Sequence, residues 1–371
     1  MSNKHKQVTA YQASAILINA TIGVGLLTLP RQVTHAARTG GWLSVIVLSA
    51  VAFLALYLYT LLGQRFGHST LPEYTVKTMG LFLGGLICLT FASGWLLFVA
   101  IQSRLFAEIV VTSVLSQVEL EVGLILMLLL AALLATQDVK GFARVNQFFL
   151  PFVVLALSLV IALSLTQVTF WRLLPPFGSG IREILSGSLV TATAFSGFEL
   201  ISLFMPFYTN PKEALKSHTR GIVLVALIYL LTVIVATGTF GVPELAKSQW
   251  PTLEMVRLIG FRGVLERLEA PFLSIYVIAV FTTAGANFFG AVLTLKQLFK
   301  LKTKEGWPYL FVPPLYYLAI RPQNIVELEN VIRTFSIAWF GYILLVPIVL
   351  LLVAIARKEE DKPDEQPQGS A

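Results

Sequence analysis

The apolar positions of this chain are grouped in blocks of about 20 residues, the length at which a helix crosses roughly 30 Å of hydrocarbon. Short polar clusters separate the blocks. In lipid the backbone must satisfy its own hydrogen bonds, so the blocks are predicted to be helices. Long apolar runs such as Val122–Ala135 argue against a β-barrel, whose strands are short and alternate. The pattern predicts about ten transmembrane helices, over residues 10–36, 41–64, 80–112, 120–137, 144–166, 183–208, 219–241, 266–299, 306–320 and 332–356.

Two of these spans carry an interruption of small and polar residues. The first contains Asn19–Gly25 and the sixth contains Thr193–Glu199. Unwinding at such points leaves backbone N–H and C=O groups without partners, and lipid cannot supply them, whereas a bound polar solute or water can. Gly23 and Gly197 are separated by close to half the chain, so each set of five spans has its interruption at the same place. This arrangement is typical of inverted-repeat transporters with a site near the bilayer midplane.

The interruptions have a simpler interpretation, since small residues also favour close helix packing in membranes. If they are sites, their chemistry suits a zwitterion. The N-terminus of a half-helix attracts a carboxylate, and the carbonyl groups at the end of the preceding half-helix accept hydrogen bonds from an ammonium group. The sequence therefore favours an amino acid as ligand.

Composition narrows the class of protein further. Only 13 % of residues are charged and the mean hydropathy is +0.78, so the formal net charge of +7 does not indicate a nucleic-acid-binding protein. Most of the 27 Lys and Arg residues fall on one predicted side of the membrane, which places both termini in the cytoplasm. Cys88 is the single cysteine, the four histidines are scattered, and no nucleophile–base pair or phosphate-binding loop is evident. We therefore expect no cofactor, no metal and no enzyme activity.

Three stretches of the chain resemble the B subunit of spore germinant receptors, the GerAB family. They read ILINATIGVGLLTLPR, TAFSGFELISLFMPFYTNPKEALKS and PTLEMVRLIGF…LERLEAPFLSIYVIAVFTTAGANFF. The family belongs to the amino acid–polyamine–organocation superfamily. The resemblance implies an all-α integral membrane protein with a LeuT-like fold of five plus five helices in inverted repeats, broken in helices one and six. Residues 1–356 would form one transmembrane domain, with repeats over about 10–166 and 183–356, and residues 357–371 a disordered cytoplasmic tail.

The resemblance also implies a location, partners and a ligand. Members of the family lie in the inner membrane of spores, act with an A and a C subunit, and bind a nutrient germinant, here expected to be a small amino acid. In the LeuT-like fold the pocket lies between the breaks and is walled by spans three and eight. The residues it assigns to ligand binding are Ile22, Gly23, Val24, Gly25, Trp95, Val99, Phe195, Ser196, Gly197, Phe198, Thr283 and Asn287.

Individual residues suggest more specific roles. Gly23 and Gly25 are expected to contact the carboxylate through the backbone, and Trp95, Val99 and Gln102 share one helical face. Thr283 and Asn287 fit either ligand contact or an interhelical hydrogen bond.

Ionisable residues within the spans are costly and often functional. Glu199 is a candidate for a proton, cation or amine site, although a structural partner would explain it equally well. Arg104 and Glu108 are expected to pair with each other, and Arg31 to anchor a helix end.

Three functions remain open at this point. The first is the nutrient-sensing subunit described above. The second is a proton-coupled amino acid permease that uses the same pocket. The third is a scaffold that assembles its partners and retains only a vestigial pocket.

Overall fold

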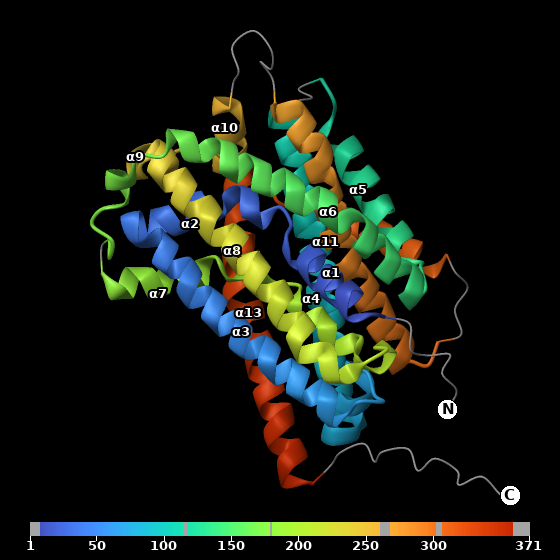
Figure 1. Cartoon of the computed structure of the whole chain (residues 1–371). Helices are drawn as coiled ribbons and strands as arrows, with labels where there is room; N and C mark the ends of the chain where they lie inside the picture. Colours follow the sequence, from blue (N-terminus) through green and yellow to red (C-terminus); the bar gives the residue numbers. More distant parts are fainter. Residues whose placement is uncertain (1–7, 114–116, 179, 260–267, 302–305, 359–371) are drawn as a thin grey trace, which may run out of the picture.

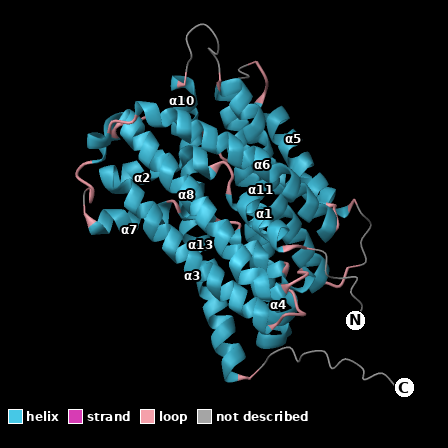
Figure 2. Cartoon of the chain, viewed as in Figure 1, coloured by secondary structure: helices cyan, strands magenta, loops and turns pink. Residues whose placement is uncertain are grey.

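The structure is a computed structural model that describes residues 8–113, 117–178, 180–259, 268–301 and 306–358. The described residues form a bundle of helices, joined by short turns and 3-10 segments (Figures 1 and 2). The helices are α1 (Ala10–Thr21), α2 (Gly25–Ala37), α3 (Gly41–Arg65), α4 (Leu71–Ser113), α5 (Leu120–Ala135), α6 (Val139–Ser164), α7 (Ile181–Val190), α8 (Ala214–Phe240), α9 (Val242–Leu245), α10 (Pro251–Leu258), α11 (Glu269–Leu298), α12 (Val312–Ile320) and α13 (Ile325–Ala356).

Six helical segments of the described chain are long and apolar enough to cross a membrane. They are Gly25–Arg65, Leu71–Ser113, Val139–Gln167, Pro211–Phe240, Ala270–Leu298 and Ile325–Ala356. A bent pair, Ile181–Val190 with Ala192–Leu203, raises the number to seven if it counts as one span. The remaining predicted spans correspond to α1, α5 and α12, which are too short to qualify alone. The count of ten therefore stays a prediction, while the all-helical membrane architecture is confirmed.

Helix starts follow from local sequence. Thr9 caps α1 in a reciprocal capping box with Gln12, and Asp138 caps α6 through Gly141 N. The sequence Asn210-Pro211-Lys212-Glu213 predicts a helix start, since Asn can cap and Pro suits the first turn, and it predicts a short cytoplasmic helix that reaches Arg220. The cap is present, with the Asn210 side chain accepting from Lys212 N. The prediction of a short separate helix is wrong, because these residues form the first turns of α8, which continues unbroken to Phe240. No glycine or proline lies between Ala214 and Arg220 to end it.

The long amphipathic loop from Gly241 to Glu269 precedes the eighth span, and its sequence predicts a short helix over Thr252–Ile259. This helix is confirmed as α10 (Pro251–Leu258). Residues 260–267, which complete that loop, lie outside the described residues, as does the predicted disordered tail from residue 359 on.

The arrangement of the bundle places the interrupted segments at its core. α11 packs against α4, α5, α6 and α1, and 72 % of its most apolar stretch is buried, more than in any other of the six spans. α1 contacts α8, α6 and α11, whereas α2 and α7 lie side by side at one end of the bundle (Figure 1). The half-helices that flank the interruptions thus pack against α3, α6, α8, α11 and α13.

Candidate functional site

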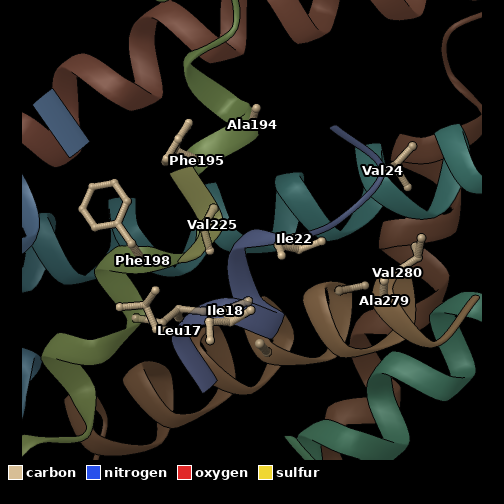
Figure 3. Packing of buried hydrophobic residues seen from close by; sticks show 14 of the residues in the cluster. Leu17, Ile18, Ile22, Val24, Ala194, Phe195, Phe198, Val225, Ala279 and Val280 are labelled. Carbon is tan, nitrogen blue, oxygen red and sulfur yellow. The ribbon is translucent and has the colours of Figure 1, made fainter. Parts of the chain in front are cut away.

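The first interruption is a non-helical stretch, Ile22–Val24, between α1 and α2; we call it the first break. Ile22 is extended (φ −79°, ψ 95°), and α2 starts at Gly25 without a side-chain cap. Figure 3 shows Ile22 and Val24 on this unwound segment, with buried apolar side chains around it. The predicted break in the first span is confirmed, at the predicted glycines.

Hydroxyl groups of neighbouring helices donate hydrogen bonds to the carbonyl groups at this break. Thr283 Oγ1, on α11, lies 2.7 Å from the carbonyl oxygens of both Asn19 and Ile22. Tyr276 OH donates to Gly23 O at 2.5 Å. Because the Thr283 hydroxyl has a single proton, it can donate to only one carbonyl at a time. The expected interhelical hydrogen bond of Thr283 is therefore present, and the break keeps a surplus of acceptors.

The N–H groups on the other side of the break have fewer hydrogen-bond partners. Val24 N donates to Gln102 Oε1 at 3.2 Å, from α4. Among the described residues we find no acceptor for the N–H groups of Gly23 and Gly25. The N-terminus of α2 therefore offers unpaired donors together with its positive dipole end.

The second break, Thr191–Gly197, follows α7, and the chain bends there by 53°. It continues in 3-10 turns over Ala192–Phe195 and Phe198–Leu203. Gly197 has φ +112°, and a Cβ atom there would lie 2.1 Å from Ala20 O. Only glycine allows the second break to rest directly on the last turn of α1.

One tyrosine and one carboxylate connect the breaks to the helices around them. Tyr229 OH lies 2.9 Å from Thr21 O and 2.8 Å from Ala194 O, so a single hydroxyl proton is shared between the two breaks. Glu199 is fully buried and accepts from Trp95 Nε1 and from Gly197 N, each at 2.9 Å. Glu199 therefore holds the second break against α4.

Two consecutive cavities lead from one end of the bundle to the breaks. The vestibule has a volume of about 330 Å³, and its lining includes His35, Arg333 and the ion pair between Arg31 and Glu329, whose atoms are 2.5 Å apart. The inner cavity has a volume of only about 20 Å³. It is lined by Gly25, Thr28, Gln32, Phe98, Ile101, Gln102, Leu105, Thr193, Ala194, Ile332 and Phe335. Gln32 and Ile332 line both cavities, so the two form one path.

The opposite end of the bundle is closed by hydrogen bonds. Val8 N donates to Phe207 O and Thr209 N donates to Val8 O, each at 2.9 Å. Nearby, the buried His218 ring contacts Thr60 Oγ1 at 2.9 Å and Tyr208 OH at 2.8 Å. We call this set of contacts the lower latch. None of the described residues of the lower latch lines the vestibule or the inner cavity.

The structure places the predicted site residues in two groups. Gly25 lines the inner cavity, together with Gln102 from the predicted face of α4. The other predicted residues surround the cavity as buried packing or backbone of the breaks: Ile22, Gly23, Val24, Trp95, Val99, Phe195, Ser196, Gly197, Phe198, Thr283 and Asn287.

Several lining residues were not foreseen. Thr193 and Ala194 directly precede the predicted Phe195, and Thr28 lies one turn after Gly25. All three could therefore have been predicted from the sequence. The contributions of α13, Ile332 and Phe335, had no signal in the sequence beyond their apolar character.

The two ion-pair predictions have clear outcomes. Arg104 and Glu108 pair within α4 at 3.4 Å, as expected. Arg31 pairs with Glu329 at the start of α13, which ties α2 to α13 across the vestibule. Arg31 was expected to anchor a helix end, but it lies inside α2, which it ties to a helix that the sequence did not identify.

Comparisons with known proteins agree with this architecture. A sequence model described as "Spore germination protein" matches residues 7–328. Spore germination protein YndE of Bacillus subtilis (strain 168) is 28 % identical over 98 % of this chain and 100 % of its own length. Spore germination protein A2 of the same organism is 26 % identical, over 95 % of this chain and 97 % of its own.

Transporters are also similar to this chain. An arginine/ornithine antiporter of Pseudomonas aeruginosa is 25 % identical over 68 % of this chain and 56 % of its own. The structure of the Eremococcus coleocola manganese transporter in complex with an aromatic bis-isothiourea substituted compound superposes with a TM-score of 0.65, at 14 % identity, covering 95 % of this chain and 82 % of the other. The fold is thus LeuT-like and transporter-like. With a family model that spans most of its length, the chain belongs to the spore germination protein family, as a GerAB-type member of the amino acid–polyamine–organocation superfamily.

Proposed function

We propose that this chain is the B subunit of a spore germinant receptor and binds a nutrient, a small amino acid, at the two breaks. Binding would bias the protein between two forms and pass the change to its A and C subunits. We place it in the spore inner membrane, with both termini in the cytoplasm. Family membership supports the role in germination, and the geometry of the breaks supports the choice of ligand.

The single observation that carries the proposal is the mismatch of hydrogen-bonding groups around the inner cavity. The N–H groups of Gly23 and Gly25 have no acceptor among the described residues. The single hydroxyl proton of Thr283 is shared among three carbonyl oxygens, and that of Tyr229 between two. Buried polar groups of this kind are normally paired. An amino acid would supply what is missing on both sides: a carboxylate for the N–H groups and an ammonium group for the carbonyls.

The vestibule supports the same ligand. It holds Arg31, Arg333 and Glu329, so it carries both signs of charge and can attract either end of a zwitterion. At about 330 Å³ it has the size of typical small-molecule sites, and it leads to the breaks through Gln32 and Ile332.

A test of this proposal uses Gly25→Trp in spores that carry the complete receptor, with receptor abundance measured by immunoblot. A Cβ at Gly25 would already lie 3.2 Å from Ala194 Cα, so an indole must occupy the inner cavity. We expect loss of the nutrient response at normal abundance. Gly341→Trp is the matched control, because Gly341 lies in α13 with open space around it. Gly25→Ala should give a smaller loss, since one methyl group requires a shift of only a few tenths of an ångström.

An unchanged response in Gly25→Trp would refute the proposed site and favour the scaffold. The permease alternative has its own support, namely the likeness to an antiporter and to a solved transporter. Vesicles that contain the purified chain separate the two functions. Accumulation of labelled amino acid indicates a permease, whereas saturable binding without flux indicates a receptor.

A further inference from the structure

The inner cavity is too small for the ligand proposed above. Its volume of about 20 Å³ is close to the space that one water molecule needs. Even the smallest amino acids exceed it several-fold, so part of the wall must move when one binds. The identity of the part that moves determines which side chains the site accepts.

Two polar side chains of the inner cavity, Gln102 and Thr193, are fixed by specific contacts. Gln102 is held by Val24 N, and Thr193 by a 2.8 Å hydrogen bond to Ser336. On the glycine side, the backbone of the second break lies 3.2 Å from the position of a Cβ at Gly25. Displacing any of these groups would break a buried hydrogen bond or shift a backbone segment.

The apolar wall is held less tightly. Phe98 of α4 and Phe335 of α13 face each other with ring centroids 6.3 Å apart and an interplanar angle of 28°. Phe98 is 3 % exposed and has no free side, but Phe335 is only partly buried and stacks at 5.7 Å on Trp339. A ring with an exposed side can turn outward without opening a void in the packed interior. Phe335 is therefore the wall that can yield.

We propose that Phe335 sets the upper size limit of the nutrient side chain. The inference rests on the proposed function. It follows from geometry, because the ligand's polar groups belong at the breaks and its side chain must then lie toward Phe98, Ile332 and Phe335. None of the described lining residues of the inner cavity is ionisable, so a charged side chain would be buried without a partner.

The experiment compares nutrient preference in spores that carry the complete receptor with wild-type chain, Phe335→Ala, Phe335→Leu or Phe335→Trp. Each strain is tested with glycine, alanine, valine, leucine and phenylalanine, and the half-maximal concentration for germination is measured for each. Ile337→Ala is the control, since it truncates a side chain on the same helix that is 50 % exposed. The ratio between two nutrients in one strain does not depend on receptor abundance, which protects the result from modest losses of stability.

We expect Phe335→Ala to improve the response to leucine or phenylalanine relative to the wild-type nutrient by at least about tenfold, the discrimination that one buried methylene group can give. Phe335→Leu should give an intermediate shift, and Phe335→Trp should favour glycine or alanine. The inference is overturned if the order of preference is unchanged in all three variants. It is overturned equally if the wild type responds to none of the five amino acids.

Gly25→Trp, tested in parallel, separates this inference from the proposed function. If Gly25→Trp abolishes the response while the Phe335 variants keep the wild-type order, the nutrient site stands and only the size limit fails. If Gly25→Trp leaves the response intact, the proposed function fails, whatever the Phe335 variants do.

Discussion

Gly197 provides a direct test of how the second break is held against the first. Its φ of +112° is unfavourable for any side chain, and a Cβ atom there would lie 2.1 Å from Ala20 O and 2.6 Å from Ala20 C. Both neighbours are backbone atoms of α1, so they cannot turn aside as a side chain would. Gly197→Ala should therefore strain the second break and also push it away from α1.

The size of the effect follows from two separate costs. An unfavourable backbone conformation costs on the order of 1–3 kcal/mol. Forcing an extra methyl group into a packed interior typically costs a further 1–3 kcal/mol, and sometimes more. Gly80 isolates the first cost, because it has φ +82° with no atom within 4 Å of a Cβ. Gly306 has neither cost, with an ordinary φ of −86° and open space. Gly197→Ala should thus be less stable than Gly80→Ala by roughly 1–3 kcal/mol.

The assay is thermal unfolding of the purified full chain in detergent, followed by intrinsic tryptophan fluorescence under identical conditions for the three alanine variants. The expected order of midpoints is Gly306→Ala highest, then Gly80→Ala, then Gly197→Ala, with the last two separated by a few degrees. If Gly197→Ala unfolds at the same temperature as Gly80→Ala, the close contact with Ala20 does not constrain the fold. The description of the two breaks as one joined unit would then be wrong.

Three further changes test the polar contacts around the breaks. Trp95→Phe keeps an aromatic ring but removes the N–H group that donates to Glu199, so the free energy of unfolding of the purified chain should fall by about 1–3 kcal/mol. An unchanged thermal midpoint would show that this bond is not formed. His218→Leu removes both ring-nitrogen contacts of the lower latch and leaves the buried Tyr208 hydroxyl without its partner, whereas Thr60 keeps its hydrogen bond to Leu56 O. Hydrogen exchange at residues 207–209 should rise, and equal protection would refute the latch. Glu329→Gln breaks the ion pair with Arg31. The Arg31 side chain is 28 % exposed and that of Glu329 is 39 % exposed, so the free energy of unfolding should change by less than about 1 kcal/mol. A large drop in the thermal midpoint would mean that the pair has a structural role.

The sequence was sufficient for the positions of the breaks because their cause is local. Small residues at Gly23 and Gly197 weaken the helix at corresponding places in the two halves, and both segments are non-helical in the structure. The number of transmembrane spans was harder to predict from the sequence. α1 and α12 are too short to qualify as membrane helices alone, and α2 runs into α3 through a single 3-10 turn.

The lining of the site depends on the rotation of each helix, which hydropathy does not report. Val99 and Phe98 are adjacent on α4 and equally apolar, yet Phe98 lines the inner cavity and Val99 packs in the core. Phe335 has the same apolar character as the residues of α13 that face outward. In a membrane helix surrounded by lipid and protein, apolar residues occur on every side, so periodicity cannot distinguish a cavity wall from packing.

A comparison of the two ends of the path bears on the choice between receptor and permease. At the vestibule end, a single partly exposed ion pair spans α2 and α13, which is a weak barrier. At the other end, the lower latch combines two backbone hydrogen bonds at Val8 with two at His218, and the two at His218 join fully buried side chains. At about 0.5–1.5 kcal/mol net for each bond, opening the latch costs roughly 2–6 kcal/mol.

A ligand can shift an equilibrium only by the difference in its affinity for the two forms. A nutrient with a millimolar Kd has about 4 kcal/mol of binding free energy in total, and only part of it can differ between the forms. Such a nutrient could reorganise the breaks and the vestibule, but opening the latch as well would use a large part or all of this free energy. The asymmetry therefore favours a sensor that responds at one face over a permease that must open both.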